Sequence, residues 1–446
     1  MKHRGRHRRR RRGAALRAVL AGTALALTAA ATLISASQAT VADDPGALKP
    51  LPSSAETGVL RLQERMTPTR SLDRLASAMG RPVGVGAVLD SADRTLREAA
   101  DCTSEERDSL PVTPAATAAY CWDPADTTGT DWQPASVTTS GDADDDGTWG
   151  AHRVILAGWT HSTTTGPTAE RGRARVAFVD ADDPRHPVYR WVLLVVPDDG
   201  GRDYRGLASP VSGMVWYQDK LLVTAGTGAA EALYVYDMNR IQRTTVDGPA
   251  VGRVPGGWSA DGYGFVMPAV GSYRFPAGHC STAESGTPCP GSLSLDRGSA
   301  PDSLVVGERT PAGGDRDARL WRYAFSVEPA RGGLLAADPL GRVDAVEAYR
   351  TGATGIRGVL SYRQPGSERS TWYVGHPPGD LDGHGTLWRQ DTDGAKAAHC
   401  GSDATHHCWA EDAGSLSYSQ ATGEVWSVTD RMLFSLPLAS IDRSLG

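Results

Sequence analysis

The sequence predicts an all-β protein, and three observations lead to that prediction. Short runs rich in β-branched and aromatic residues recur along most of the chain, bounded by Gly, Asp, Pro and Ser. Several of these runs alternate apolar and polar residues, as half-buried strands do. A similar short pattern also returns several times, which indicates a repeated supersecondary unit.

Each repeat begins with a first run of small and apolar residues. Four such runs lie at 213–218, 291–296, 358–363 and 414–419, and a weaker fifth lies at 135–140. A second run follows each, starting at 153, 220, 303, 371 and 424, and a third starts at 175, 232, 319, 386 and 432. Fourth runs start at 190, 263 and 344. Five four-stranded repeats with small first-strand residues indicate sheets around an axis, where bulky side chains do not fit.

In these runs the chain resembles the β-propeller superfamily. The stretch DKLLVTAGTGAAEALYVYDMNRI at 219–241 is similar to the middle hairpin of a degenerate propeller blade. The resemblance implies a five-bladed β-propeller over 131–446, without a subfamily signature such as a Trp-Asp ending. β-Sandwich domains are the alternative, because five hairpins can also pack face to face.

The last repeat lacks a fourth strand within its own sequence. A closed ring would take that strand from upstream of the first repeat, and RPVGVGAVLD at 81–90 is the candidate. The N-terminal segment 57–130 is expected to hold helices, this one strand and a disulfide loop, because apolar residues follow helical spacing at 60–66 and 72–79. The Pro- and Ser-rich residues 40–56 predict a flexible lead-in.

Residues 1–39 have the pattern of a signal peptide. A basic stretch, MKHRGRHRRRRRGAALR, precedes the apolar AVLAGTALALTAAATLI, and small residues then offer a cleavage site. The sequence therefore predicts a secreted, extracellular protein. A retained membrane anchor is the alternative, because the uncharged run continues to Ala42. Arg11 and Arg12 leave open whether export uses the general or the twin-arginine route.

The mature chain is expected to be strongly acidic. Removing the nine Lys and Arg of the leader from the 46 of the whole chain leaves 37 against 52 acidic residues, a net charge of about −15. Such a surface disfavours nucleic acid and anionic membranes. We therefore expect neither as a partner once the leader is removed.

The six cysteines predict disulfides in an exported chain. They form three close pairs in the sequence, Cys102 with Cys121, Cys280 with Cys289, and Cys400 with Cys408. This clustering favours those three pairings among the 15 that six cysteines allow.

The stretch DADDDG at 142–147 is a candidate calcium loop. Asp142, Asp144 and Asp146 stand at alternate positions and Gly147 follows, as in the first half of an EF-hand-like loop. The second half does not match, because Arg153 stands where a bidentate Glu belongs. The alternative is an acidic turn on an enlarged hairpin loop. No other cofactor is expected.

Most tryptophans fall in predicted strands, where we expect them to pack between blades. Trp122, Trp132, Trp149, Trp258 and Trp409 lie nearer to loops and are candidates for surface contacts.

No catalytic motif is found: the chain has no nucleophile elbow, phosphate-binding loop, dinucleotide fingerprint or zinc-protease motif. We therefore expect an extracellular binding or scaffold module for a glycan or protein ligand rather than an enzyme. The alternative is a polysaccharide hydrolase or lyase with carboxylates at the channel mouth. Asp380, Asp382 and His384 belong to a second acidic loop that is interpreted as a weak metal site, as a source of two carboxylates for a glycosidase, or as an ordinary turn. A structural envelope protein would need neither site, and the sequence leaves the oligomeric state open.

Overall fold

The chain is rich in β-strands throughout the part that the structure describes. The computed structural model describes residues 44–445 except 130, 162–172, 209, 227–229, 279, 281–285, 315, 365–366, 368, 379–382 and 401–404. The predicted leader at 1–39 lies outside the described residues. The compact unit Gly46–Gly446 contains every strand given below.

Five antiparallel meanders of four strands each make up most of the described chain. Meander one is β6 (Trp132–Thr139), β7 (Val154–His161), β8 (Ala174–Asp180) and β9 (Val188–Asp198), and meander two is β11 (Gly213–Tyr217), β12 (Lys220–Ala225), β13 (Ala232–Asp237) and β17 (Phe265–Arg274). Meander three is β18 (Pro290–Asp296), β19 (Ser303–Glu308), β20 (Ala318–Ala324) and β22 (Glu347–Thr351). Meander four is β23 (Gly358–Tyr362), β24 (Thr371–His376), β25 (Thr386–Gln390) and β26 (Ala395–Ala397). Meander five is β27 (Leu416–Ser419), β28 (Glu424–Val428), β29 (Met432–Pro437) and β5 (Ala118–Cys121).

The predicted repeats correspond to these meanders. The second strands β12, β19, β24 and β28 begin at the residues that the sequence predicts, and the third strands lie within a residue of theirs. The prediction succeeds because each strand is specified locally, by β-branched and aromatic residues between turn-forming ones.

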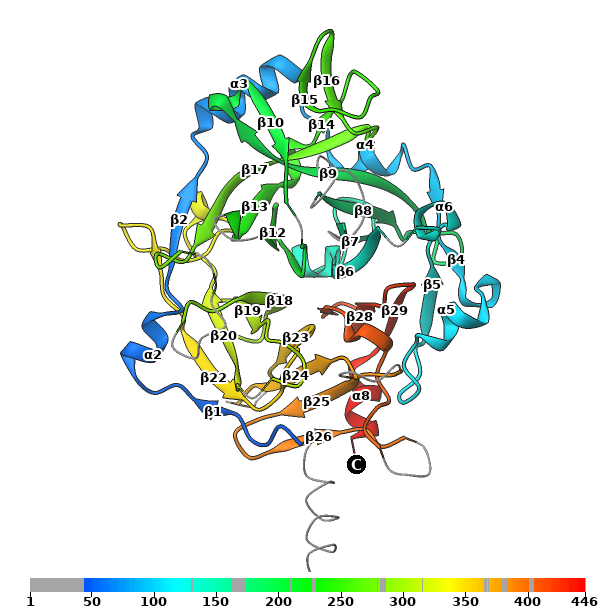
Figure 1. Cartoon of the computed structure of the whole chain (residues 1–446), viewed down its shortest axis with the longest axis vertical. Coiled ribbons are helices and arrows are strands. Elements are labelled where there is room, and N and C mark those ends of the chain that lie inside the picture. Colours follow the sequence, from blue (N-terminus) through cyan, green and yellow to red (C-terminus); the bar gives the residue numbers. More distant parts are fainter. Residues whose placement is uncertain are drawn as a thin grey trace, which may run out of the picture. The chain divides into compact units, whose positions relative to one another are not determined.

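The first strands of the five meanders contact one another in a closed sequence. β6 contacts β11, β11 contacts β18, β18 contacts β23, β23 contacts β27, and β27 contacts β6. Three of these strands, β6, β18 and β23, are labelled near the centre of Figure 1. Close approach explains the small residues at their starts: a Cβ added at Gly213 would lie 2.6 Å from the carbonyl oxygen of Gly291.

Buried apolar clusters lie between neighbouring meanders, and each contains a tryptophan. Trp216 packs between meanders one and two, Trp321 between two and three, and Trp372 between three and four. Trp409 packs between four and five, and Trp159 between five and one. The packing role predicted for strand tryptophans is therefore confirmed at four of these positions. The surface role predicted for Trp409 is wrong, as it is for the buried Trp122 and Trp258.

Residues 46–121 form an N-terminal belt along the outer strands (Figure 1). Three of its strands each pair with the outer strand of a meander: β1 (Lys49–Pro50) with β22, β2 (Leu62–Met66) with β17, and β3 (Arg94–Thr95) with β9. At its end β5 pairs with β29, and β4 (Arg97–Glu98) pairs with the other edge of β5. The belt thus adds strands to meanders three, two, one and five in turn.

The strand that completes meander five is β5, so the candidate at 81–90 is wrong. Residues 85–89 of that candidate form helix α4 (Val85–Leu89), whose Val85, Val88 and Leu89 enter the cluster between meanders one and two. The helix expected at 72–79 is confirmed as α3 (Thr69–Met79), whereas 62–66 is the strand β2 because it pairs with β17. The segment 57–130 therefore holds several short strands rather than one.

The remaining described elements are short. They are α2 (Ser54–Gly58), α5 (Ser104–Asp108), α6 (Pro124–Thr127), α7 (Ser140–Ala143), α8 (Leu438–Ser444), β10 (Asp203–Gly206), β14 (Gln242–Arg243), β15 (Val251–Val254), β16 (Gly257–Ala260), β21 (Arg342–Val343), and 3₁₀ turns at Ala99–Asp101, Asp199–Gly201, Met238–Arg240, Pro329–Arg331 and Glu411–Ala413. Among the described residues no helix has both the length and the apolar character needed to cross a membrane.

The three predicted disulfides are all present. Cys102 is bonded to Cys121, Cys280 to Cys289, and Cys400 to Cys408, with Cα–Cα distances of 5.9, 4.8 and 5.7 Å. The first of them ties the start of α5 to the closing strand β5.

The buried carboxylate of Asp126, which lies just after the N-terminal belt, connects the belt to meander one. Asp126 in α6 accepts hydrogen bonds from the Tyr189 hydroxyl at 2.7 Å and from Trp191 Nε1 at 3.0 Å. It also lies 3.4 Å from the guanidinium of Arg175, and both side chains are only 7% exposed. Arg175 in turn stacks 3.7 Å from the centre of the Trp191 ring. Asp126 is therefore the main counter-charge of a buried arginine.

Replacing Asp126 with Ala is expected to destabilise the protein by about 3 kcal/mol, because it leaves Arg175 buried without its carboxylate. Chemical unfolding of the two proteins measures the difference. Asp393→Ala is the control: Asp393 pairs with Arg369 on the surface, so its removal should change stability by less than about 0.5 kcal/mol. Equal losses in the two variants would contradict a special role for Asp126.

Candidate functional site

A cavity of about 640 Å³ lies where the first strands of the meanders begin. All five meanders contribute to its wall, through Gln133, Thr160, Pro210, Ser212, Ser292, Arg309, Arg357, Pro377, Asp412 and Asp430 among others. Antiparallel pairing explains this convergence, because it places the start of each first strand beside the end of the second, as in Gly213 opposite Thr224. The segments before first strands and after second strands therefore meet at one end of the structure.

The positive charges of the wall come from meanders three and four. Arg309 follows β19 and forms an ion pair with Glu231 at 3.2 Å. Arg357 precedes β23 and is exposed, and its guanidinium has no hydrogen-bond or ion-pair partner among the described residues. A free guanidinium at a cavity wall is a ready donor to a carboxylate, phosphate or carbonyl oxygen.

The negative charges come from meander five. Asp412 precedes β27, and Asp430 follows β28. Burial raises the pKa of Asp430, the charge of Asp412 raises it further, and Arg431, 3.5 Å away, opposes both. Burial and the charge of Asp430 also raise the pKa of the neighbouring Glu411. One oxygen of Asp430, Oδ1, is buried without a hydrogen bond from any described residue.

The backbone of Asp412 is in the left-handed region, with φ of 59°. Non-glycine residues adopt this conformation at a cost of about 1–3 kcal/mol, and such residues are often found at functional sites. Here it places an exposed carboxylate with no described partner at the cavity wall.

Hydroxyl groups also line the cavity. Thr160 and Ser212 are partly exposed there, whereas Ser292 is 1% exposed and its buried Oγ has no hydrogen-bond partner among the described residues. Buried polar groups normally have a partner, so the Ser292 hydroxyl is an exception, and its burial keeps it from the cavity surface. Within the described wall no Trp, Tyr or Phe is present.

The candidate calcium ligands are not brought together. Asp142 is 2% exposed, and its Oδ2 accepts hydrogen bonds from Thr138 and Ser417, each at 2.6 Å. Asp144 and Asp146 lie on the surface, where Asp146 Oδ1 accepts a hydrogen bond from the Thr148 amide at 2.8 Å. Calcium binding by this loop stays a prediction, and it would require Asp142 to leave its two hydroxyl partners.

Asp142 instead connects three meanders. Thr138 belongs to β6 and Ser417 to β27, and the carbonyl oxygen of Asp142 accepts a hydrogen bond from Arg297, just after β18, at 2.7 Å. Burial raises the pKa of its carboxyl group, against the opposing effect of the two hydroxyl hydrogen bonds.

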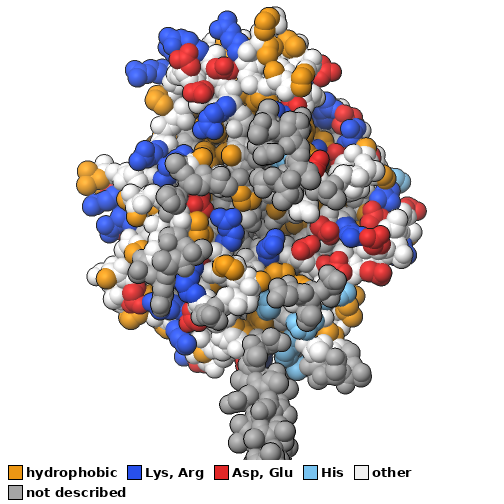
Figure 2. Space-filling model, in the orientation of Figure 1, with side chains coloured by type: hydrophobic (Ala, Val, Ile, Leu, Met, Phe, Trp, Pro, Cys, Tyr) orange, Lys and Arg blue, Asp and Glu red, His pale blue; other side chains and the backbone are white. Residues whose placement is uncertain are grey.

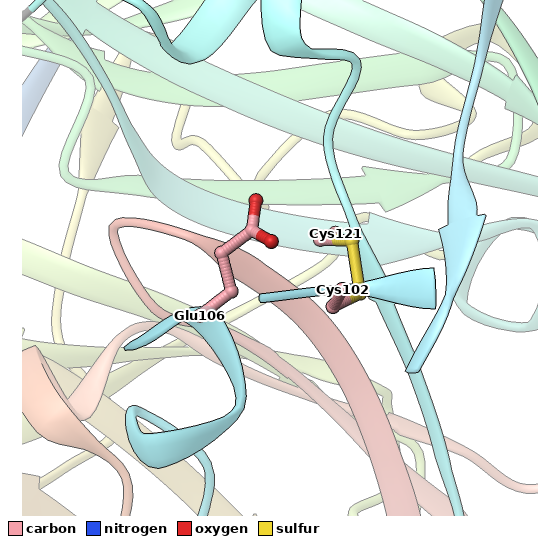
Figure 3. Close-up of side chains that lie close together, drawn as sticks. All are labelled: Cys102, Glu106 and Cys121. Atoms are coloured by element: carbon pink, nitrogen blue, oxygen red, sulfur yellow. A yellow bond between two sulfur atoms is a disulfide. The ribbon is translucent and has the colours of Figure 1, made fainter. Parts of the chain in front are cut away.

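Two other groups place potential metal ligands within 4.8 Å of one another in the described chain. The first is His152, Asp180 and Asp182, which offers one nitrogen and two carboxylates; its His152 Nδ1 already lies 2.8 Å from Asp182 Oδ2. The second is Cys102, Cys121 and Glu106 (Figure 3). Its two sulfur atoms are joined in a disulfide, so they are not thiolate donors. Glu106 there accepts hydrogen bonds from Arg97 and from the backbone of Thr103.

The carboxylates predicted for a hydrolase, Asp380 and Asp382, lie outside the described residues. His384 is described, and its Nε2 lies 2.9 Å from the carbonyl oxygen of Leu110 rather than at the cavity wall. The acidic residues that do line the cavity, Asp412 and Asp430, have no distinctive sequence spacing, and Arg309 and Arg357 belong to no motif. Only their positions at repeat boundaries could have indicated them.

No protein-family model and no curated protein matches the sequence. Three solved structures with low similarity are a gluconolactonase from Xanthomonas campestris, the extracellular domains 1–2 of Drosophila Semaphorin 1a, and Drosophila Plexin A in complex with Semaphorin 1b. The first shares 13% identity, with 80% of this chain and 98% of that chain covered and a TM-score of 0.27. The second shares 12% identity, with 70% of this chain and 87% of that chain covered and a TM-score of 0.27. The third shares 11% identity, with 78% of this chain and 88% of that chain covered and a TM-score of 0.24. TM-scores this low assign this chain no activity and no partner.

Replacing Asp142 with Asn is expected to change how stability depends on pH. Because the folded pKa of Asp142 is raised, its stabilising contribution is fully present below the unfolded pKa, about 3.9, and is lost as pH rises through the folded pKa. Asn cannot titrate, and its oxygen can still accept from Thr138 and Ser417. The free energy of unfolding of the variant, relative to that of the wild type, should therefore increase between acid and neutral pH. The increase should be about 1.4 kcal/mol for each unit by which folding raises the pKa of Asp142.

Urea unfolding at a series of pH values from 4 to 8 measures this difference. Asp144→Asn, at an exposed position of the same loop, is the control, and its plot of unfolding free energy against pH should run parallel to that of the wild type. Parallel curves for Asp142→Asn as well would show that Asp142 titrates normally.

Proposed function

We propose that this protein is an extracellular five-bladed β-propeller that binds a glycan or protein ligand in its central cavity. The observation that carries the proposal is the cavity itself, which all five meanders line and where Arg357 and Asp412 have no described partner. Pockets of about 300–1,000 Å³ with a few converging polar groups are typical of binding sites.

Five blades are supported by the five meanders and by the packing between them. The apolar clusters follow the order one–two, two–three, three–four, four–five and five–one, so the described meanders leave no unpaired end. Secretion is supported by the leader-like sequence at 1–39 and by three disulfides, which persist in oxidising compartments.

Replacing Arg357 with Ala is expected to weaken ligand binding at least about tenfold, because a charge-assisted hydrogen bond contributes about 1.5–3 kcal/mol. Mature wild-type protein would be screened against a random peptide library and a glycan array, and the affinity of any ligand found would be measured by calorimetry for both proteins. Arg70→Ala, an exposed position on α3 away from the cavity, is the matched control. Equal affinities for all three proteins would place the binding site elsewhere.

A second function, cleavage of a polysaccharide by hydrolysis or by elimination, is favoured by one specific observation. Asp430 and Asp412 place two carboxylates at the cavity wall, and the pKa of Asp430 is raised by burial and by the charge of Asp412. A carboxyl group that stays protonated at higher pH suits a general acid beside an ionised partner.

If the protein is such an enzyme, Asp430→Asn should lower turnover at least about 100-fold, the usual size of a general acid contribution. Because the pKa of Asp430 is raised, the rate that depends on its proton should persist above the ordinary carboxyl range and fall as pH rises further. Release of reducing ends or unsaturated products from a panel of polysaccharides measures the rate. Asp393→Asn, at an exposed surface position, is the control, and an unaltered rate in Asp430→Asn would exclude this mechanism.

A further inference from the structure

The charges on the cavity wall are separated rather than paired. Arg309 and Arg357 come from meanders three and four, and Asp412 and Asp430 come from meander five. No ion pair joins either arginine to either aspartate, and all four residues are described. The charged neighbours that shift the pKa of Asp430 are Asp412 and Arg431, not the two arginines of the cavity. The cavity therefore presents a positive side and a negative side at once.

Charged side chains of both signs lie on the face of the molecule in Figure 2. Basic side chains lie near its centre, acidic side chains with some basic ones among them gather to the right of the centre, and the left and the top carry both signs (Figure 2). A ligand with one charge would gain from one side of the cavity and leave the other side uncompensated. A ligand with two opposite charges is complementary to both sides.

The uncharged part of the described wall also bears on the ligand class. It includes Pro210 and Pro377, which offer apolar contacts, and Ser212, whose partly exposed side chain can hydrogen-bond to an amide. Carbohydrate ligands are usually held by stacking on aromatic rings, and the described wall has none. Between the two ligand classes of the proposed function, these features favour a protein.

We infer that the cavity binds a peptide segment that directs a Lys or Arg side chain toward Asp412 and Asp430 and a carboxylate toward Arg357. This inference rests on the proposed binding function and specifies its ligand. Arg309 lies on the same side as Arg357 but is already paired with Glu231. Arg357 is therefore the arginine that selects the acidic group.

A hexapeptide library tests the inference. The peptides are N-acetylated and C-amidated, so that only side chains carry charge, and they contain one Lys and one Glu at varied spacing, Lys alone, Glu alone, or neither. We expect the best Lys-and-Glu peptides to bind the wild-type protein at least about tenfold more tightly than the best peptide of any other class, as measured by fluorescence anisotropy.

The variants assign each charge to its side of the cavity. Arg357→Ala should remove the preference for Glu, so that Lys-and-Glu peptides bind no more tightly than Lys-only peptides. Asp430→Asn should weaken the preference for Lys, so that the advantage of Lys-and-Glu peptides over Glu-only peptides becomes smaller. Arg357→Glu should make Lys-only peptides the better ligands. Arg357 is exposed and the Asp430 side chain is 30% exposed, and thermal unfolding checks that each variant is folded.

The pH dependence gives a second readout. A bound ammonium favours the ionised form of Asp430, so affinity for Lys-containing peptides should rise as pH increases through the titration of Asp430, and binding should release protons. Both effects should disappear in Asp430→Asn and persist in the control Arg70→Ala.

Three outcomes would overturn the inference, and only the last would also overturn the proposed function. Peptides that bind without regard to charge would show that the cavity does not select a dipolar ligand. Glycans that bind on an array and lose affinity in Arg357→Ala, while no peptide binds, would show that the ligand is a carbohydrate. Absence of binding by any peptide or glycan would contradict both the inference and the binding function.

Discussion

Closure between meander five and meander one is the constraint on which the rest of the structure depends. A row of packed sheets leaves an apolar face exposed at each end, and exposed faces of that size are costly in water. Here the two end faces bury each other through a cluster that includes Trp159 of β7 and Leu433 of β29. Tyr120 of the closing strand β5 belongs to the same cluster, so the N-terminal region and the last sheet must fold together.

The N-terminal belt holds this closure in place. Its short strands would not be stable alone, because two- to five-residue strands form few hydrogen bonds, but each adds to a sheet that already exists. The disulfide between Cys102 and Cys121 ties β5 to the preceding turn, and Asp126, just beyond β5, is buried against meander one. The belt thus covers sheet edges that would otherwise be open to pairing with other chains.

The cavity is a consequence of the same arrangement. Because all first strands start at one end, residues separated by nearly 300 positions, such as Gln133 and Asp430, come to line one space. Some of these positions, such as Ile356 and Val428, also belong to the buried clusters, whereas Arg357 and Asp412 are exposed and can carry charge. Arg357 and Asp412 stand on different meanders, and neither has a hydrogen-bond or ion-pair partner among the described residues.

Local patterns determined much of this protein in advance. Strand sequences specified most of the meanders because β-propensity and turn residues act over a few positions, and sequence proximity specified the three disulfides. The closing strand escaped prediction, since Ala118–Cys121 has too few residues to show alternation. Val85 and Val88 are β-branched, as is typical of strands, but their spacing of three residues buries both on one side of a helix. The spacing of Asp142, Asp144 and Asp146 indicated a convergent loop, yet Thr138 and Ser417 hold Asp142 inside the protein. Only the tertiary structure decided this, and only it brought Arg357 and Asp430 to one cavity, because their meeting depends on how distant meanders pack.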